Sequence, residues 1–270
     1  MSTAIETDVW NTAALDVDAY LARIGLHRSE ATLEALHEAH VRAIPFENVD
    51  PVLGTTPDLE LSAIAGKLVD RKRGGYCFEH ALLFAAVLER LGYAVQRRLS
   101  RVQPHKAGPR THMMLIVGHN GRDHLVDVGY GAGMMRPMPL EDGVVVSQAG
   151  WDHQLTQDGP LWTLSKRAGD DWEPQHAFDD QPQRLIDYEL SNYYVATHPH
   201  SPFTSKLIVM RLDHGISRRL VGNELTVEHA DGRVDTTAVT PATLGETLRS
   251  LDLDLPAAVL EGLVSVSRRY

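Results

Sequence analysis

The chain has 270 residues, of which 43% are hydrophobic and 23% are charged, so it can fold around a substantial core. Its net charge of -10 argues against a nucleic-acid-binding protein, which needs a basic face. The apolar run at residues 81–88 is too short to span a bilayer, and residues 1–10 do not resemble a signal peptide. A single cysteine cannot form an internal disulfide, so we expect a cytoplasmic protein with no membrane partner.

The first third of the chain is predicted to be helical. Asp16 can cap a helix that ends at Gly25, and Ser29 can cap a second helix, because both side chains accept hydrogen bonds from free backbone N–H groups. A third helix is expected from Leu59 to Leu68. A fourth is expected from Cys77 to Leu91, and its nearly uniform apolar character predicts that it is buried.

From about Tyr93 the pattern changes to short strands, which we expect to continue through about Tyr194. The stretches LIVMRL and NELTVEH add further strands. TPATLGETLRSL and PAAVLEGLVSV predict helices near the end of the chain. Helices, then an antiparallel sheet, then a mixed tail predict an α+β protein.

Cys77 is the only cysteine, and it stands directly after a Gly-Gly-Tyr sequence at the predicted start of a helix. The helix dipole and the free backbone N–H groups at such a position favour a thiolate. The same N–H groups can stabilise an oxyanion on a bound acyl group. A buried, unreactive cysteine is the alternative, since free cysteines are often buried. His80 lies one turn further along the same helix, where it is poorly placed to share a proton, so we interpret it as a packing residue.

A base for this thiol is predicted by the sequence THMMLIVGHNGRDHLVDVGY. Its dipeptide Asn120-Gly121 is the strongest short signal for a β-hairpin. If these two residues form the turn, His112 faces Gly129, and Asp127 lies one diagonal step from His112 on the same face of the sheet. Diagonal neighbours are roughly 7–8 Å apart at the backbone, within reach of a hydrogen bond between side chains. A one-residue bulge would instead place the two side chains on opposite faces.

Cys77 and this pair would form a Cys-His-Asp triad, in which the imidazole accepts the thiol proton and the carboxylate orients the imidazole. The alternative is that His112 is an ordinary strand histidine and Asp127 an ordinary carboxylate at a turn.

Five segments, in this order, resemble the arylamine N-acetyltransferases: IPFENVD, RGGYCFEH, THMML, VDVGYG and YYVATHPHSPF. The resemblance implies a helical bundle over residues 1–92, a β-barrel over 93–200 and an α/β lid over 201–270, around a cysteine-proteinase-like catalytic core. It implies N-acetylation of aromatic amines or hydrazines by a ping-pong mechanism through an acetyl-cysteine. Acetyl-CoA would be a co-substrate, with no tightly bound cofactor and no metal.

Position by position, the resemblance makes Cys77 the nucleophile, His112 the base and Asp127 the residue that orients the base. Two departures from the family's pattern are visible. Ala81 stands where the family usually has asparagine, which should change local packing more than chemistry. Tyr130 stands where phenylalanine is common, and its hydroxyl leaves the acceptor preference open.

The resemblance also suggests residues that contact the substrates. Tyr130 and Phe203 are the candidates for the acceptor pocket, although either could be a plain core residue. Thr111 and Gly131 flank the triad and could contact the pantetheine arm of CoA through backbone groups.

Other charged and ring side chains are interpreted separately. Glu47 and Arg73 are expected to form an ion pair that supports the cysteine loop. His198 and His200 are interpreted as loop histidines rather than as metal ligands. A basic stretch could meet the phosphates of CoA, but a solvated strand face and loop is the favoured interpretation; it contains Arg97, Arg98, Arg101, Lys106 and Arg110.

Alternative functions stay open from the sequence alone. Thiol proteases and transglutaminases use the same order of triad residues, and some relatives are amide synthases that close macrolactams. A binding protein without enzymatic activity is the alternative from another class. A homo-oligomer is compatible with the sequence, which does not determine the oligomeric state.

Overall fold

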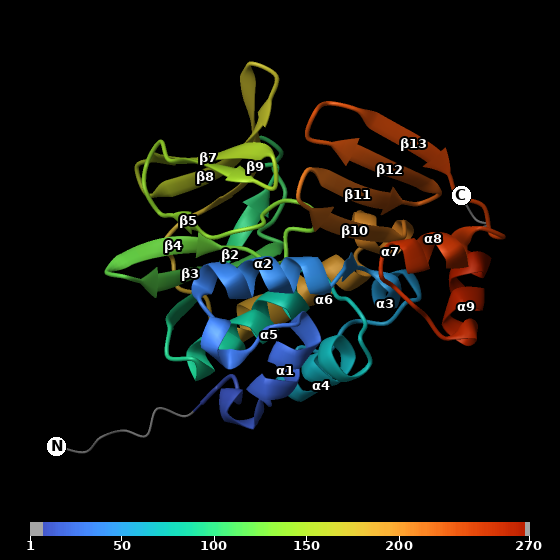
Figure 1. Ribbon diagram of the computed structural model, residues 1–270, viewed down its shortest axis with the longest axis horizontal. Coiled ribbons are helices and arrows are strands. Elements are labelled where there is room, and N and C mark those ends of the chain that lie inside the picture. Colours follow the sequence, from blue (N-terminus) through green and yellow to red (C-terminus); the bar gives the residue numbers. More distant parts are fainter. Residues whose placement is uncertain (1–7, 268–270) are drawn as a thin grey trace.

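The computed structural model describes residues 8–267. The first part of the chain forms a layer of helices beneath two sheets (Figure 1). The helices are α1 (Val17–Ile24), α2 (Leu33–Ala43), α3 (Val49–Val52), α4 (Leu61–Ala65) and α5 (Cys77–Arg90), with short 3-10 turns at Thr12–Ala14 and Arg28–Glu30 and a π-helical turn at Gly66–Asp70.

The start and end of α1 are as predicted. The Asp16 carboxylate accepts a hydrogen bond from the backbone N–H of Ala19 at 3.0 Å. Gly25 ends the helix in the left-handed conformation, with φ at 73°. Glycine adopts this conformation without the steric cost that a Cβ atom would add.

The prediction that Ser29 caps the second helix is wrong. The cap of α2 is Thr32, whose hydroxyl accepts from the N–H of Ala35 at 3.2 Å. Ser29 instead lies within the preceding 3-10 turn, which the Glu30 carboxylate closes by accepting from the N–H of His27 at 3.2 Å. The chain is extended again at Thr32, so the α-helix can begin only after it.

The third predicted helix is interrupted. The regular α-helix α4 covers only Leu61–Ala65, and the following residues form a wider turn in which the N–H of Arg71 donates to the carbonyl of Gly66 at 3.2 Å. This turn carries Lys67, whose buried ammonium group is important for the site described below.

Helix α5 is the buried centre of the helical layer, as predicted. Every residue from Cys77 to Leu88 is buried. The helix contacts α1 and α4 as well as the strands β2 and β3. Its first residue is therefore held at a junction between the helices and the larger sheet.

The larger sheet has eight antiparallel strands and curls into a nearly closed barrel (Figure 1). In spatial order, the strands are β5 (Met138–Pro139), β4 (Arg122–Val126), β3 (His112–His119), β2 (Ala94–Val102), β9 (Asp171–Phe178), β8 (Leu161–Ala168), β7 (Trp151–Asp158) and β6 (Val145–Gln148). Its interior is filled by apolar side chains that include Met114, Leu125, Leu155 and Leu164.

The β3–β4 hairpin has the predicted turn and register. Asn120 and Gly121 have φ values of 51° and 76°, the positive values that a two-residue type I′ turn requires. Leu115 pairs with Val126 without a bulge on the way from the turn. This register places His112 and Asp127 on the same face of the hairpin, as predicted.

The smaller sheet contains β1 (Phe46–Glu47), β10 (Ile208–Asp213), β11 (Ile216–Val221), β12 (Glu224–His229) and β13 (Val234–Ala238), in that order. Strand β1 comes from the helical part of the chain and pairs with β10. The predicted helices α8 (Leu244–Ser250) and α9 (Ala257–Ser267) are present, and Leu244 and Leu248 pack against Val209 and Leu220 of this sheet.

The expectation of strands through Tyr194 is wrong. Residues in that stretch form helix α6 (Leu185–Thr197), followed by the short helix α7 (Pro202–Ser205). The buried residues Tyr188, Ser191 and Val195 recur at helical spacing, and Tyr188 packs against Trp10. Aromatic and β-branched residues give this stretch a strand-like composition, but burial of this face against the helical layer selects the helix.

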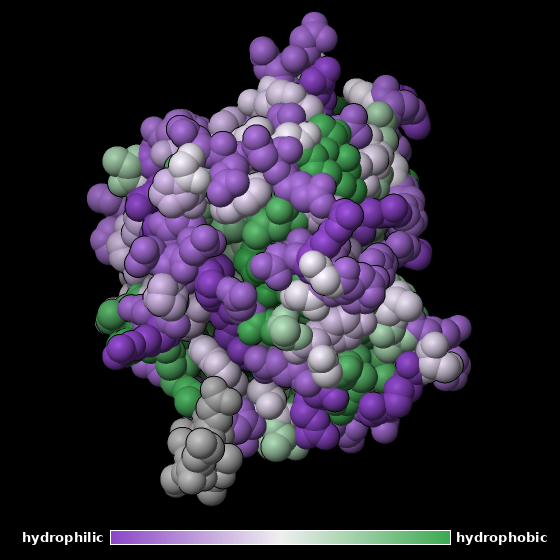
Figure 2. All heavy atoms as spheres, turned by 90° about the vertical axis from the view of Figure 1, so that its left-hand side faces the viewer, coloured by the Kyte–Doolittle hydropathy of each residue, from purple (hydrophilic) through white to green (hydrophobic). Residues whose placement is uncertain are grey.

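The molecule as a whole is an α+β protein, as predicted. The division into three modules at residues 92 and 200 stays a prediction. Helix α6, which precedes residue 200, packs against the helical layer, and β1, which precedes residue 92, pairs with β10. The face that lies on the left of Figure 1 is mostly hydrophilic, with separate apolar areas between polar side chains (Figure 2). Across residues 8–267, no helix combines the length and the apolar character needed to cross a bilayer.

Candidate active site

The Gly-Gly turn before Cys77 is packed too closely to accept side chains. A Cβ atom on Gly74 would lie 2.1 Å from the carbonyl oxygen of Pro45, and one on Gly75 would lie 2.7 Å from Oε2 of Glu79. The same Glu79 carboxylate accepts from the N–H of Tyr76 at 3.1 Å and caps α5. These contacts place Cys77 at the first position of the helix.

A buried ion-pair network supports this turn. The predicted pair is confirmed: Arg73 Nε and Nη2 lie 3.0 and 2.6 Å from Oε1 of Glu47. The other members of the network were not predicted from the sequence. Arg73 also contacts Asp50 at 3.1 Å, and Lys67 Nζ lies 2.5 Å from Asp50 and 2.8 Å from Glu79. The network connects the turn, the π-helical segment and the start of α5.

Burial and charge act in opposite directions within the network. Burial raises the pKa of Glu79 to about 7, although Lys67 opposes this shift. Burial also opposes the charged form of Asp50, but Lys67 and Arg73 outweigh it and lower the pKa of that carboxyl. The two cations therefore keep Asp50 ionised, whereas burial makes Glu79 easier to protonate.

His80 is buried, as its interpretation as a packing residue requires, and it belongs to a hydrogen-bonded chain. Its Nδ1 lies 2.8 Å from Nε2 of His40, and His40 Nδ1 lies 2.8 Å from the hydroxyl of Tyr20. On its other side, His80 Nε2 donates to the carbonyl oxygen of Gly75 at 3.0 Å. This chain fixes the cysteine turn from behind and does not direct His80 towards the thiol.

His112 and Asp127 are hydrogen-bonded to each other, as the hairpin register predicted. His112 is the first residue of β3, and Asp127 directly follows β4. Their atoms Nε2 and Oδ2 are 2.6 Å apart. Gly129 brings this pair close to the cysteine, since a Cβ atom there would lie 2.9 Å from the Cα of Cys77.

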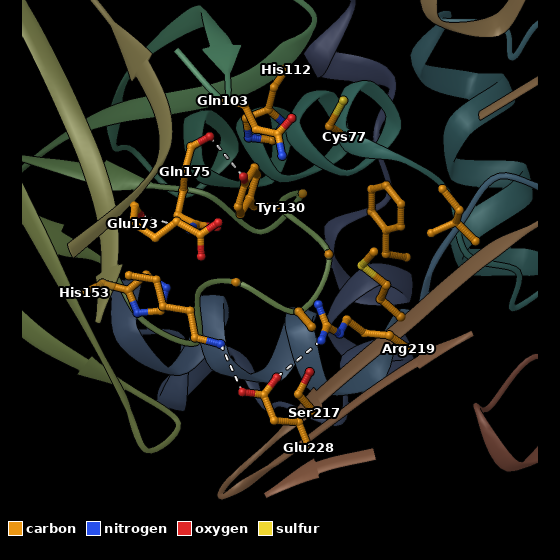
Figure 3. Close-up of a pocket in the computed structure, with 18 of the residues that line it drawn as sticks. Cys77, Gln103, His112, Tyr130, His153, Glu173, Gln175, Ser217, Arg219 and Glu228 are labelled. Carbon is orange, nitrogen blue, oxygen red and sulfur yellow. Dashed lines mark hydrogen bonds and ion pairs between the residues drawn. The ribbon is translucent and has the colours of Figure 1, made fainter. Parts of the chain in front are cut away.

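Cys77 lies on the other side of the imidazole. Its Sγ is 3.8 Å from the carbonyl oxygen of Thr111, and Cys77 is close enough to His112 to help raise the pKa of the imidazole. Figure 3 shows the Cys77 and His112 side chains next to each other at one end of a cavity. The thiol, the imidazole and the carboxylate thus form a continuous series.

The charges of His112 and Asp127 strongly affect each other's pKa values, and Cys77 adds to the shift in the pKa of His112. Burial opposes the charged form of His112, but Asp127 and Cys77 outweigh it and raise the pKa of the imidazole to about 10. Burial opposes the charged form of Asp127 as well, yet His112 and His176 hold the pKa of that carboxyl well below its usual range. At neutral pH the pair is therefore an imidazolium and a carboxylate.

Two further histidines lie beside Asp127, and neither was predicted from the sequence. His176 Nε2 lies 3.3 Å from Oδ2 of Asp127 and helps to lower the pKa of that carboxyl, while burial lowers the pKa of His176 itself. His37 Nε2 accepts from the backbone N–H of Asp127 at 3.3 Å. They come from β9 and α2, far from the hairpin in sequence, and no local motif marks them.

Among the described residues, one group has side chains arranged so that they could hold a metal ion: His112, Asp127 and His176, all buried. The group contains the imidazole and the carboxylate of the triad arrangement, so a metal there would take the place of the hydrogen bond between His112 and Asp127. His198 and His200 lie at the end of α6, where His198 stacks on Tyr194 and is not part of this group.

A cavity of about 730 Å³ lies between the barrel and the smaller sheet. Six of the predicted site residues line it, namely Cys77, Thr111, His112, Tyr130, Gly131 and Phe203. Asp127 is buried beside His112 and does not line the cavity. The structure therefore brings the predicted site residues together around one space.

The substrate-facing candidates differ in how they are held. The hydroxyl of Tyr130 donates to the carbonyl of Gln175 at 3.2 Å, so the departure from phenylalanine ties the ring to the barrel wall. Phe203 lies on α7 and packs against Phe46 and Tyr76. Gly131 has φ at +66°, and a Cβ atom there would lie 2.5 Å from Sδ of Met210. Ala81 is buried in the core of the helical layer.

The basic stretch does not line the cavity, and it is not uniformly solvated as the favoured interpretation expected, because Arg97 is buried. Arg97 pairs with Glu89 at 2.7 Å and lies over the ring of Trp10, while Arg110 pairs with Asp179. None of its five basic residues lines the cavity.

A thiol at a helix start, facing an imidazole that a carboxylate orients, is the arrangement of enzymes that transfer acyl groups through a cysteine. A family profile described as N-acetyltransferase matches residues 30–258. The arylamine N-acetyltransferase of Mycolicibacterium smegmatis is 40% identical over 235 residues, which cover 82% of this chain and 85% of that protein. The chain belongs to the arylamine N-acetyltransferase family.

Solved structures show the same fold. The crystal structure of the Nocardia farcinica arylamine N-acetyltransferase is similar with a TM-score of 0.89 and 39% identity, over 96% of this chain and 98% of that one. The structure of the Mycobacterium marinum arylamine N-acetyltransferase in complex with CoA is similar with a TM-score of 0.87 and 32% identity, over 94% and 99% of the two chains.

Proposed function

We propose that this protein transfers the acetyl group of acetyl-CoA to aromatic amines or hydrazines through an acetyl-cysteine at Cys77. The observation that carries the proposal is the series of Cys77, His112 and Asp127 at one end of the cavity, with 2.6 Å between His112 Nε2 and Asp127 Oδ2. Membership of the family and the similarity to a relative whose structure contains CoA support the choice of donor.

Before the first half-reaction, the proton of the Cys77 thiol is already on His112, so the two side chains form a thiolate–imidazolium pair. The thiolate sulfur attacks the thioester carbon of acetyl-CoA, and backbone N–H groups at the start of α5 stabilise the oxyanion. The bond from carbon to the CoA sulfur then breaks. CoA leaves as a thiol with the proton that His112 returns, and the acetyl group stays on Cys77.

In the second half-reaction, the nitrogen of the acceptor attacks the acetyl-cysteine. His112 removes the proton of the attacking nitrogen, and the bond from carbon to Sγ of Cys77 breaks. The product is the acetylated amine, and the thiolate–imidazolium pair is restored. Asp127 keeps the imidazole in the required orientation and stabilises its charged form. Because one product leaves before the second substrate reacts, the kinetics are ping-pong.

The walls of the cavity suggest where the substrates bind. We assign Tyr130 and Phe203 to the aromatic acceptor, since both line the cavity that Cys77 opens into. We assign Thr111 and Gly131 to the pantetheine arm of CoA for the same reason. A reactive free thiol fits a reducing compartment, so the cytoplasm stays a prediction, as does the oligomeric state.

A panel of arylamines and arylhydrazines, incubated with acetyl-CoA, tests this function. We expect an acetylated acceptor together with free CoA, and loss of both products in the Cys77→Ser variant. If no acceptor is acetylated while a longer acyl thioester is consumed, an amide synthase replaces the proposed function.

A further inference from the structure

A carboxylate bridges the barrel and the smaller sheet at the outer end of the cavity. Glu228 of β12 lies between two cations, with Oε1 3.5 Å from Nζ of Lys166 on β8 and Oε2 3.4 Å from Nη2 of Arg219 on β11. Figure 3 shows Glu228 and Arg219 across the cavity from Cys77 and His112. The Arg219 side chain is 44% exposed, whereas Cys77 is 4% exposed, so the bridge lies nearer to solvent than the thiol.

Strand register places these charges on both cavity walls. On the barrel side, Lys166 pairs with His153 in β7 and with Glu173 in β9, and all three line the cavity. On the other side, Glu228 pairs with Ser217, which is two residues from Arg219 on the same face of β11. The charged groups are thus regular features of both sheets rather than flexible loop residues.

The cavity has an excess of cations in an otherwise acidic protein. Lys166, Arg167 and Arg219 line it against Glu173 and Glu228, while the whole chain has a net charge of -10. Burial lowers the pKa of Lys166 even though Glu228 opposes that shift. Glu228 and Glu173 together therefore do not compensate the burial of the ammonium group and the repulsion from Arg219, and the site favours additional negative charge.

The bridge is also loose enough to be exchanged. Its N···O separations of 3.4 and 3.5 Å exceed the usual 2.7–2.9 Å of charge-assisted hydrogen bonds. Partly exposed ion pairs with such geometry contribute little stability. A phosphate has more charge and more acceptor oxygens than a carboxylate, and the guanidinium group can bind it with two parallel hydrogen bonds.

We propose that Lys166 and Arg219 bind a phosphate group of CoA and that Glu228 is the internal anion which this phosphate displaces. The inference rests on the proposed function, because the thiol end of the same CoA molecule must reach Cys77. Re-formation of the Glu228 bridge would then favour release of CoA after the first half-reaction.

Steady-state kinetics with two acetyl donors test the site. S-acetylpantetheine has the same thioester as acetyl-CoA but no phosphate. In the Lys166→Met/Arg219→Met double variant we expect the KM for acetyl-CoA to rise about tenfold or more, as for loss of charge-assisted contacts, with no change for S-acetylpantetheine. Glu228→Gln should lower the KM for acetyl-CoA about threefold, because the competing charge is removed.

Arg218→Met is the matched control, because Arg218 lies on the same strand but does not line the cavity. It should leave the KM for both donors unchanged. If Glu228 only held the two sheets together, Glu228→Gln and the double variant would change the KM for acetyl-CoA and the KM for S-acetylpantetheine in the same direction. That result, or an unchanged KM for acetyl-CoA in the double variant, would overturn the proposal.

Calorimetric titration separates failure of this inference from failure of the proposed function, since it requires no turnover. CoA should bind the unmodified protein and bind the double variant about tenfold more weakly. Equal binding, or no binding of CoA to the unmodified protein, contradicts the site. Dephospho-CoA, which lacks the 3′-phosphate, identifies the phosphate group that is bound. If the double variant weakens the binding of dephospho-CoA as much as that of CoA, the two residues bind the diphosphate. If it weakens only the binding of CoA, they bind the 3′-phosphate.

Discussion

Asp127 is a buried carboxylate that keeps a buried imidazole charged. Its Oδ2 contacts His112 at 2.6 Å, and its Oδ1 accepts from the N–H of Gly129 at 3.1 Å. Without this partner, burial would favour neutral His112, as it does for His37, whose pKa burial lowers to about 4. The charge of His112 therefore depends strongly on Asp127, with a further contribution from Cys77.

The Asp127→Asn variant should remove this charge with little change in volume. Burial would then dominate, and the pKa of His112 would fall from about 10 to below neutrality. We expect kcat/KM for acetyl transfer to fall by roughly 10²–10⁴-fold. The rate at which iodoacetamide alkylates Cys77 at neutral pH should fall as well, because the imidazolium partner of the thiolate is lost.

Asp123→Asn is the control, because Asp123 is an exposed residue at the outer end of the same hairpin. It should leave both rates unchanged. An Asp127→Asn variant with the pH profile of the unmodified protein would show that Asp127 does not set the charge of His112.

Individual site residues could be predicted from the sequence only where they lie close together along the chain. His112 and Asp127 are joined by a hairpin whose Asn-Gly turn fixes the register, so their common face followed from counting residues. His37 and His176 reach Asp127 from other elements through tertiary packing, which leaves no periodicity or motif in the sequence.

The turn before α5 depends on ion pairs between elements. Glu47 on β1 is 1% exposed, and Arg73 is its charged partner. Removing one partner of a buried pair leaves the other charge desolvated, whereas exposed pairs are worth little.

Arg73→Met should therefore lower the free energy of unfolding by roughly 3–5 kcal/mol. Arg28→Met, which breaks the exposed pair with Asp18, should lower it by only about 0–1 kcal/mol. Urea denaturation of both variants measures the difference. Equal losses would mean that the buried network does not hold the cysteine turn.

The elements themselves were predictable where caps and turns are local. Asp16 and Gly25 delimit α1, and the Gly-Gly turn precedes α5, because these residues act on their own backbone. Helix α6 was not predictable in the same way, because its aromatic and β-branched residues favour a strand until burial of Tyr188 and Val195 is taken into account.

Over the whole molecule, buried histidines with lowered pKa values should make the fold sensitive to acid. Burial lowers the pKa of His37, His80 and His153 to about 4 each. Their folded pKa lies below the unfolded value near 6.5, so they contribute stability above about pH 6.5 that is lost as the pH falls towards 4. His112 acts differently, because its raised pKa gives stability that is complete at acid pH and lost as the pH rises towards 10.

Urea denaturation at pH 7.5 and 4.5 measures this effect. Since one pKa unit corresponds to about 1.4 kcal/mol, we expect each of the three rings to contribute roughly 2–3 kcal/mol to the loss at the lower pH. Equal free energies of unfolding at the two pH values would contradict these assignments.

The α+β class was predictable from the order of helical and strand-like segments, but the position of the cavity was not. The cavity is closed by β10, β11 and β12, whose position depends on contacts between residues far apart in sequence, such as the pairing of β1 with β10 and the hydrogen bond from the N–H of Gly215 to the carbonyl of Ala149. The charged bridge of Lys166, Glu228 and Arg219 is a product of that arrangement. No short motif contains it.

Mass spectrometry of the intact protein, mixed with acetyl-CoA and no acceptor, tests the proposed mechanism most directly. The mechanism predicts one added acetyl group, located on Cys77 by peptide mapping, with release of one equivalent of CoA and removal of the acetyl group when an arylamine is added. A protein that remains unmodified at Cys77 under these conditions, or one that acetylates the amine without this intermediate, would contradict it.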